Sequence, residues 1–204
     1  LQHRVKNSLA LIASLLSLES SSLPGGQARE ALESARSRID SVMQLYQQLY
    51  GTRSIGDIRI DGYLRDVARS IVDSLAGDRT GIAVEFETAE AMLDTQRSVS
   101  LGLILNELVV NAIKYGCPGG RGRIRIGLEK GDGRLSLVVS DEGPGLPAGF
   151  SLPGKGWEGG SLGFTLVSQL VGQLSGSLSA GPGPGGRGAS FSLSFPLGEG
   201  QPQA

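Results

Sequence analysis

The sequence predicts an α+β protein in two parts: an N-terminal antiparallel helical hairpin over residues 1–55, and an α/β sandwich over residues 56–200. Two consecutive segments with helical spacing, joined by the breaker-rich stretch 20–26, predict the hairpin. Helical and alternating periods that follow one another from residue 56 predict the sandwich. With 204 residues, of which 39% are hydrophobic, the chain can form one ordinary domain and a smaller one.

The first helix is predicted over residues 1–20. At about 100° per residue, its apolar positions form a stripe roughly 60° wide; they are Val5, Leu9, Ile12 and Leu16. His3, the only histidine, lies about 150° from the centre of that stripe and should point to solvent, on the same side as Asn7. This segment alone fits both a phosphate acceptor and an exposed histidine without a role.

A second helix is predicted over residues 27–50, because apolar side chains again recur at helical spacing from Leu32 to Leu49. Neither helix can cover its apolar stripe alone. The hairpin must therefore pack on the rest of the chain or on a second copy. The simplest solution is a homodimer held by a four-helix bundle.

The second part alternates between the two periods. Helices are predicted near residues 61–76, 97–116 and 161–175. Strands are predicted at 82–86, 124–128 and 135–140, with a final pair ending in the alternating run 189–195. This order indicates a mostly antiparallel sheet covered on one face by helices.

Charge and composition exclude several classes of protein. The formal net charge of −1 gives no broad field for nucleic acid or an anionic membrane. A single cysteine, Cys117, excludes an internal disulfide and suits a reducing compartment. No apolar run is long enough to span a bilayer, so we expect a cytoplasmic protein. Because the helical stripe is already in phase at Leu1, we also expect a piece of a longer protein.

The helix at 97–116 carries a candidate polyphosphate site. Glu107, Asn111 and Lys114 fall within about 60° of one another, away from an apolar face that consists of Leu101, Leu105, Leu108 and Ala112. Carboxylate and amide oxygens suit Mg²⁺, and an ammonium suits phosphate. A solvated helix face with one salt bridge explains the same pattern.

Two glycine-containing segments follow. In DEGPG (141–145), Asp141 ends a buried strand and can accept a hydrogen bond from an exocyclic amine such as that of adenine, while Gly143 and Gly145 let a planar base approach. GGSLGF (159–164) opens a helix whose N-terminus favours phosphate. Ordinary turn chemistry at Asp141 and a simple N-cap at Ser161 are the alternatives.

Taken in order, these segments make the chain resemble a sensor histidine kinase of a two-component system. HRVKN (3–7) is similar to the phosphoacceptor box and ELVVNAIKYG (107–116) to the N box, while DEGPG and GGSLGF are similar to the two glycine boxes. The resemblance covers nearly the whole chain. Arginine after the histidine resembles the subclass related to the HWE kinases, although the N box lacks the histidine that helps to define that group.

The resemblance implies a dimerisation and phosphotransfer hairpin followed by the ATP-binding fold shared with type II topoisomerases and heat-shock chaperones. Its implied ligands are ATP and Mg²⁺, its partner is a response regulator receiver domain, and its sensor domain would precede Leu1. His3 would be phosphorylated, with Arg4, Asn7 and Glu107 beside it in catalysis, and Asn111 and Glu107 would face the metal. The implied nucleotide-binding residues are Asn111, Lys114, Tyr115, Asp141, Gly143, Gly145, Ser161, Leu162 and Gly163, with a lid over roughly 146–160.

The sequence departs from the family at two positions. Many histidine kinases carry Glu or Asp after the histidine, where this chain has Arg4. A cation there should favour the neutral, nucleophilic imidazole and could steady the incoming phosphoryl group. Gly160 and Ser161 stand where other kinases often have Thr and Gly.

Two further glycine patterns match the spacing of nucleotide-binding motifs but lack the residues or elements that those motifs require. The stretch from Gly149 to Lys155 resembles the start of a P-loop, but Gly156 replaces the hydroxyl residue that should bind magnesium. Residues 181–186 fit G-x-G-x-x-G between two strands, so we interpret them as a hairpin loop. Two other functions stay open: a phosphotransfer adaptor whose second domain has lost ATP, and a serine kinase on the same fold.

Overall fold

A computed structural model describes residues 57–76, 81–152 and 162–197, together with scattered positions between 14 and 39. The chain divides into two units, Leu1–Ile55 and Gly56–Ala204. In the first unit the described positions between 14 and 21 and between 28 and 39 are helical. Arg36 Nη1 donates to Ser17 Oγ at 3.1 Å and so joins the two helical stretches, as a helical hairpin requires.

The second unit contains a five-stranded sheet with strand order β2-β4-β5-β7-β6. Its strands are β2 (Gly81–Thr88), β4 (Arg121–Gly131), β5 (Arg134–Asp141), β6 (Ser177–Pro182) and β7 (Ala189–Pro196). Only β2 and β4 pair in parallel, while the other neighbours are antiparallel. The mostly antiparallel sheet expected from the sequence is confirmed.

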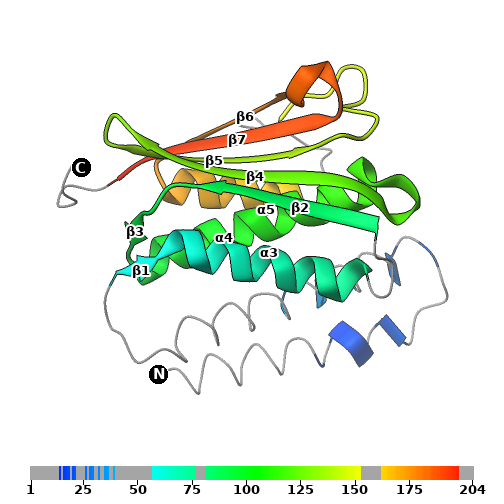
Figure 1. Cartoon of the computed structure of the whole chain (residues 1–204). Helices are drawn as coiled ribbons and strands as arrows, with labels where there is room; N and C mark the ends of the chain where they lie inside the picture. The colour runs from blue at the N-terminus through cyan, green and yellow to red at the C-terminus, as the bar shows by residue number, and fades with distance from the viewer. Residues whose placement is uncertain are drawn as a thin grey trace. The chain divides into compact units, whose positions relative to one another are not determined.

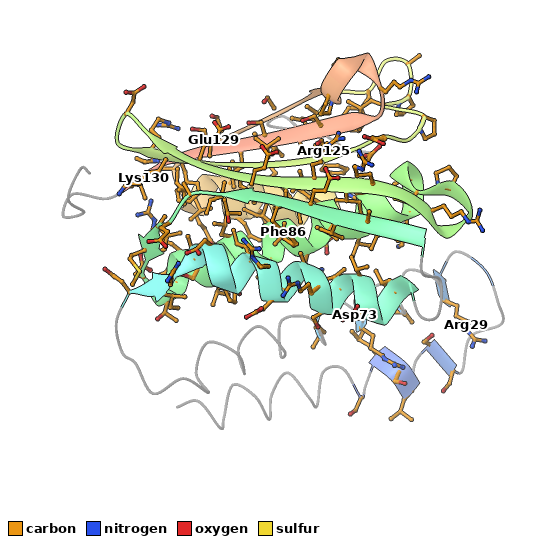
Figure 2. All side chains as sticks on the ribbon, in the orientation of Figure 1. Arg29, Asp73, Phe86, Arg125, Glu129 and Lys130 are labelled. Carbon is orange, nitrogen blue, oxygen red and sulfur yellow. The ribbon has the colours of Figure 1, made fainter. Side chains whose placement is uncertain are left out.

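Three helices cover one face of this sheet (Figure 1): α3 (Ile60–Ala76), α4 (Thr95–Asn111) and α5 (Leu162–Gln173). The strands alternate because only one of their faces is covered. The buried set includes Ile124, Ile126, Leu128, Leu135, Leu137, Val139, Leu193 and Phe195. Phe86 also points from β2 towards α3 (Figure 2), where the Arg65 guanidinium lies 5.1 Å from the centre of its ring.

Local chemistry explains where the elements begin and turn. Asp94 caps α4 by accepting the Arg97 N–H at 3.0 Å, so this helix starts two residues earlier than its apolar pattern predicts. Asp132 and Gly133 join β4 to β5 with φ of +50° and +69°, which is the geometry of a tight hairpin turn. A small two-stranded sheet of β1 (Ile58–Arg59) and β3 (Met92–Leu93) was not predicted, because two-residue strands leave no periodic signal.

The helix predicted over 97–116 changes character at its end. After Asn111 the backbone continues as a π-helix, η1 (Ala112–Gly116), followed by the short 3₁₀ helix η2 (Pro118–Gly120). A π-helix bonds residue i to i+5 and therefore winds more slowly than an α-helix. The uniform 100° step used to place Lys114 on one ridge with Glu107 is wrong for this last turn.

Among the described residues, no helix combines the length and the apolar character that crossing a bilayer would need.

Tyr63 on α3 has a buried hydroxyl without a hydrogen-bond partner in the described part of the chain. Its side chain is 7% exposed and lies over Gly102 of α4, where a Cβ would come within 2.3 Å of the hydroxyl oxygen. We expect Tyr63→Phe to raise the free energy of unfolding by about 1 kcal/mol, because an unsatisfied buried polar group is removed. Urea denaturation measures this change, and Tyr115→Phe is the control, since Tyr115 is 70% exposed.

The buried phenol of Tyr63 should also make the free energy of unfolding depend on pH in the alkaline range. Burial raises the pKa of Tyr63, so above pH about 10 the phenol ionises in the unfolded chain before it ionises in the folded one. The unaltered protein should therefore lose stability as the pH rises through that range, and Tyr63→Phe should lose less. A Tyr63→Phe variant that is less stable than the parent at pH 7 would contradict an unpaired hydroxyl.

Candidate functional site

Asp141 lies at the end of β5, and its side chain is held by backbone donors from two directions. It is 6% exposed. Its Oδ1 accepts the Gly143 N–H at 2.9 Å and the Ala189 N–H at 3.3 Å. Within the described part of the chain, no group donates a hydrogen bond to Oδ2. The carboxylate is therefore fixed through one oxygen, and the other oxygen can accept from a ligand.

Glycines surround this carboxylate because no larger residue fits there. A Cβ on Gly116, at the end of η1, would lie 2.3 Å from Asp141 Cγ. A Cβ on Gly143 would lie 2.5 Å from the Cα of Gly116. These distances are far below van der Waals contact, so the segment 107–116 and the segment 141–145, distant in sequence, meet at their glycines.

Glu107 and Asn111 are one helical turn apart on α4. Glu107 is 4% exposed and Asn111 is half-buried, whereas the opposite face of α4 is fully buried in the core through Leu101, Leu105 and Leu108. A solvated face, the simpler explanation of this pattern, is wrong for Glu107. A buried carboxylate is costly to maintain, which favours a functional role for it.

Lys114 and Tyr115 lie on the π-helical turn and are exposed. Lys114 forms no ion pair with any described residue, so the single salt bridge that the sequence pattern also allowed is absent from this part of the chain. Turns of π-helix inside α-helices are frequent at functional sites. This turn leaves both side chains available to a ligand beside the buried Gly116.

Glu142, next to Asp141, is tied to the sheet by ion pairs. Arg125 on β4 bonds Glu142 at 2.6 Å and Glu85 of β2 at 2.9 Å. Arg123 bonds Glu85 at 3.1 Å and lies 3.6 Å from Glu142. Arg125 projects from the side of β4 that faces away from the helices (Figure 2). The network anchors the loop that begins at Asp141 to two strands.

Cys117 is buried beside the same carboxylate. Burial and then the negative charge of Asp141 raise the pKa of its thiol, so the neutral form is favoured. A neutral, buried thiol is a poor nucleophile. Cys117 is therefore a packing residue at the wall of the site.

Several predicted site residues lie outside the described residues: His3, Arg4, Asn7 and Ser161. Leu162 is the first residue of α5, although its side chain is not described, and Gly163 beside it is buried. The proposed lid over 146–160 is described as far as residue 152. Gly145 has φ of +89°, and a Cβ there would lie 3.2 Å from the Gly188 carbonyl oxygen.

Sequence reasoning missed the part that the β6–β7 hairpin plays in this site. The sequence predicts that residues 181–186 form a loop between two strands. This is confirmed, although Gly181 and Pro182 belong to β6 itself. The loop nevertheless closes on Asp141 through the Ala189 N–H. Its run of glycines was the available signal, but the partner that these glycines approach depends on which strands become neighbours in the fold.

Two protein families match the chain. A family described as histidine kinase matches residues 1–75, and the family of histidine kinase-, DNA gyrase B- and HSP90-like ATPases matches residues 96–199. The second match contains every described site residue, from Glu107 to Gly163.

Individual relatives agree with these families. Sensor histidine kinase PdtaS of Mycolicibacterium smegmatis is 32% identical over 97% of this chain and 39% of its own length. Blue-light-activated histidine kinase 2 of Erythrobacter litoralis is 28% identical over 96% of this chain and 56% of its own length. The chain thus spans less than two thirds of either relative.

Among solved structures, the histidine kinase domain of the Erythrobacter litoralis EL346 blue-light activated kinase has a similar fold. Its TM-score is 0.66 at 28% identity, and the match covers 96% of this chain and 91% of that domain.

Close packing at Gly116 yields a direct test of the site. We expect Gly116→Ala to lower the free energy of unfolding by about 2 kcal/mol, because a methyl group placed against Asp141 overpacks the contact. Gly172→Ala in α5 is the control, since nothing lies within 4 Å of its Cβ position and alanine favours a helix by about 0.5–1 kcal/mol. Urea denaturation of both variants should show opposite signs, and equal stabilities would contradict the close approach.

Proposed function

Because the chain belongs to the sensor histidine kinases, we propose that it uses ATP to phosphorylate His3 and then passes the phosphoryl group to an aspartate of a response regulator. The proposal assigns dimerisation and phosphotransfer to residues 1–55 and ATP binding and catalysis to residues 56–200. The observation that carries it is the buried Asp141, whose Oδ1 is occupied by two backbone donors and whose Oδ2 is left to a ligand.

The base would bind at Asp141. Adenine carries an exocyclic amine that donates a hydrogen bond, and an oriented carboxylate oxygen in a nearly buried site is the matching acceptor. Gly143 and Gly145 would support the site indirectly, because their missing side chains let this segment pack against the backbones of Gly116 and Gly188. Tyr115, the residue before Gly116, is 70% exposed and would supply an aromatic surface at the rim.

The polyphosphate and Mg²⁺ would lie along α4. The described residues contain no group of three or more His, Cys, Asp or Glu side chains suited to a metal. This donor set still fits Mg²⁺, which usually takes one or two protein oxygens and completes its shell with substrate phosphates and water. Asn111 and Glu107 would supply those oxygens, and the bound ion would neutralise charge that develops on the phosphates.

The remaining charge of the phosphates would be met by Lys114 and by the start of α5. Lys114 is exposed and forms no ion pair with a described residue, so its ammonium is available. Ser161, Leu162 and Gly163 would present backbone N–H groups at the N-terminus of α5, where the helix dipole favours an anion.

In the transfer step, the lone pair of a neutral imidazole nitrogen of His3 would form a bond to the γ-phosphorus while the bond to the bridging oxygen breaks and ADP leaves. The proton on the other ring nitrogen would then be released to a base or to water. Such transfer depends on positioning and charge neutralisation more than on covalent help from the protein. Glu107 and Asn7 are the candidates to orient the reacting groups, and Arg4 would steady the phosphoryl group. The hairpin would pair with a second copy, and its exposed faces would receive the receiver domain. We propose the cytoplasm, where ATP and receiver domains occur, as the site of the reaction.

One labelling experiment separates this function from its competitors. The full chain is incubated with γ-labelled ATP and Mg²⁺, and the label is tested in acid and in base. A histidine kinase gives acid-labile, base-stable label in the parent and none in His3→Gln. The control for nucleotide binding is Asp141→Asn, which should also lose the label because the base is no longer held.

The other outcomes are equally distinct. No label from ATP, with label from an added phosphodonor, would identify a phosphotransfer adaptor and contradict the kinase. Acid-stable label on an added protein would identify a serine kinase. Label that persists in His3→Gln would show that another residue is the acceptor.

The departure at Arg4 predicts a shifted pH profile. A carboxylate in its place would favour the protonated imidazole of His3, which is not a nucleophile. We expect Arg4→Glu to autophosphorylate more slowly than the parent at neutral pH, with its rate rising at higher pH. Arg4→Lys keeps the cation and should keep the profile. Faster labelling of Arg4→Glu at neutral pH would refute the electrostatic role.

A further inference from the structure

The loop between β6 and β7 is fitted to the backbone of Asp141. At its base the Gly183 N–H donates to the Gly188 carbonyl at 3.1 Å. A Cβ on Gly188, whose φ is +68°, would lie 1.8 Å from the Asp141 carbonyl oxygen. A Cβ on Gly183 would lie 2.8 Å from that same oxygen. Both legs of the loop therefore touch Asp141 at positions where only glycine fits.

The tip of the same loop is free of such contacts. Gly185 has φ of +70°, almost the value at Gly188, yet nothing lies within 4 Å of its Cβ position. An alanine would meet similar backbone strain at both positions. Only at Gly188 would it also push the loop away from Asp141.

The β6–β7 hairpin supplies Asp141 Oδ1 with a second N–H donor, in addition to the one from its own segment, 141–145. Gly143 lies two residues after Asp141, in the loop that follows β5, so its N–H closes only a local turn with the carboxylate. Ala189 is the first residue of β7, the strand paired with β5, and its N–H reaches Oδ1 from the body of the sheet. Two donors from different segments fix the carboxylate, whereas the local one alone would tie it only to the loop that follows β5.

We infer that the base of the β6–β7 hairpin, formed by Gly183, Gly188 and the Ala189 N–H, is a positioning element that sets the selectivity of the site for a base with an exocyclic amine. The inference rests on the proposed function, in which that amine donates to Asp141 Oδ2. Because the sheet holds Oδ1, the carboxylate keeps a single orientation and Oδ2 faces the ligand. Displacing the hairpin would release that orientation, while the side chains on α4 proposed to bind phosphate would stay in place.

The test compares two triphosphates that differ at the amine. ATP and inosine triphosphate, which has an oxygen in place of the amine, are titrated with Mg²⁺ into the full chain, and Kd is measured by calorimetry. We expect Gly188→Ala to bind ATP at least about tenfold more weakly than the parent, as for loss of a hydrogen bond to a charged group. Its affinity for inosine triphosphate should stay within about twofold. The matched control, Gly185→Ala, should bind both as the parent does.

Each other outcome has one meaning. If Gly188→Ala binds ATP as tightly as Gly185→Ala, the hairpin does not position Asp141, and the proposed function still stands. Equal losses for both triphosphates would also overturn the inference, because they indicate general damage to the site. A parent that binds neither triphosphate would overturn the proposed function itself.

A second measurement does not depend on whether Gly188→Ala folds. In amide NMR spectra, Asp141→Asn should move the signals of both Gly143 and Ala189, because both N–H groups donate to Oδ1, and should leave Gly185 in place. An Ala189 signal that does not move while Gly143 moves would overturn the inference.

Discussion

The site depends on one constraint: a carboxylate at the end of a central strand must be held in a single orientation inside nearly buried surroundings. Asp141 meets it because Oδ1 accepts N–H groups from Gly143 and from Ala189. The first donor belongs to the loop that leaves β5, and the second belongs to β7. The antiparallel pairing of β5 with β7 brings them together, so the sheet topology determines the chemistry of the site.

The helix layer also helps to hold Asp141 in place. Core packing of Leu101, Leu105 and Leu108 fixes α4 on the sheet and leaves Glu107 and Asn111 on the flank that continues into η1. The π-helical turn ends at Gly116, which lies against Asp141: a Cβ there would lie only 2.3 Å from Cγ. At the opposite end of α4, Arg97 donates to the Pro196 carbonyl and lies 5.2 Å from the ring centre of Phe195. Strand β7 is thus joined to α4 at one end and to Asp141 at the other.

Much of this fold could be predicted from the sequence, because period and burial are local properties. The alternation through Phe191, Leu193 and Phe195 and the stripe of leucines on α4 are confirmed as buried faces. The π-helical turn could not be predicted, since residues 112–116 continue the same apolar pattern while their backbone changes its hydrogen bonding. The approach of Gly188 to Asp141 could not be predicted either, because it depends on which strands become neighbours. Glycines in a sequence indicate that another segment packs closely against them, but only the folded structure shows which segment this is.

We propose that Asp141 Oδ2 is the acceptor for the exocyclic amine of a bound adenine nucleotide. A crystal structure of the chain with Mg²⁺ and a non-hydrolysable ATP analogue tests it most directly. We expect the amine nitrogen within hydrogen-bond distance of Oδ2, about 2.7–3.2 Å, with the Gly143 and Ala189 N–H groups still on Oδ1. A base bound elsewhere, or an amine that faces solvent while Asp141 keeps its present contacts, would contradict it.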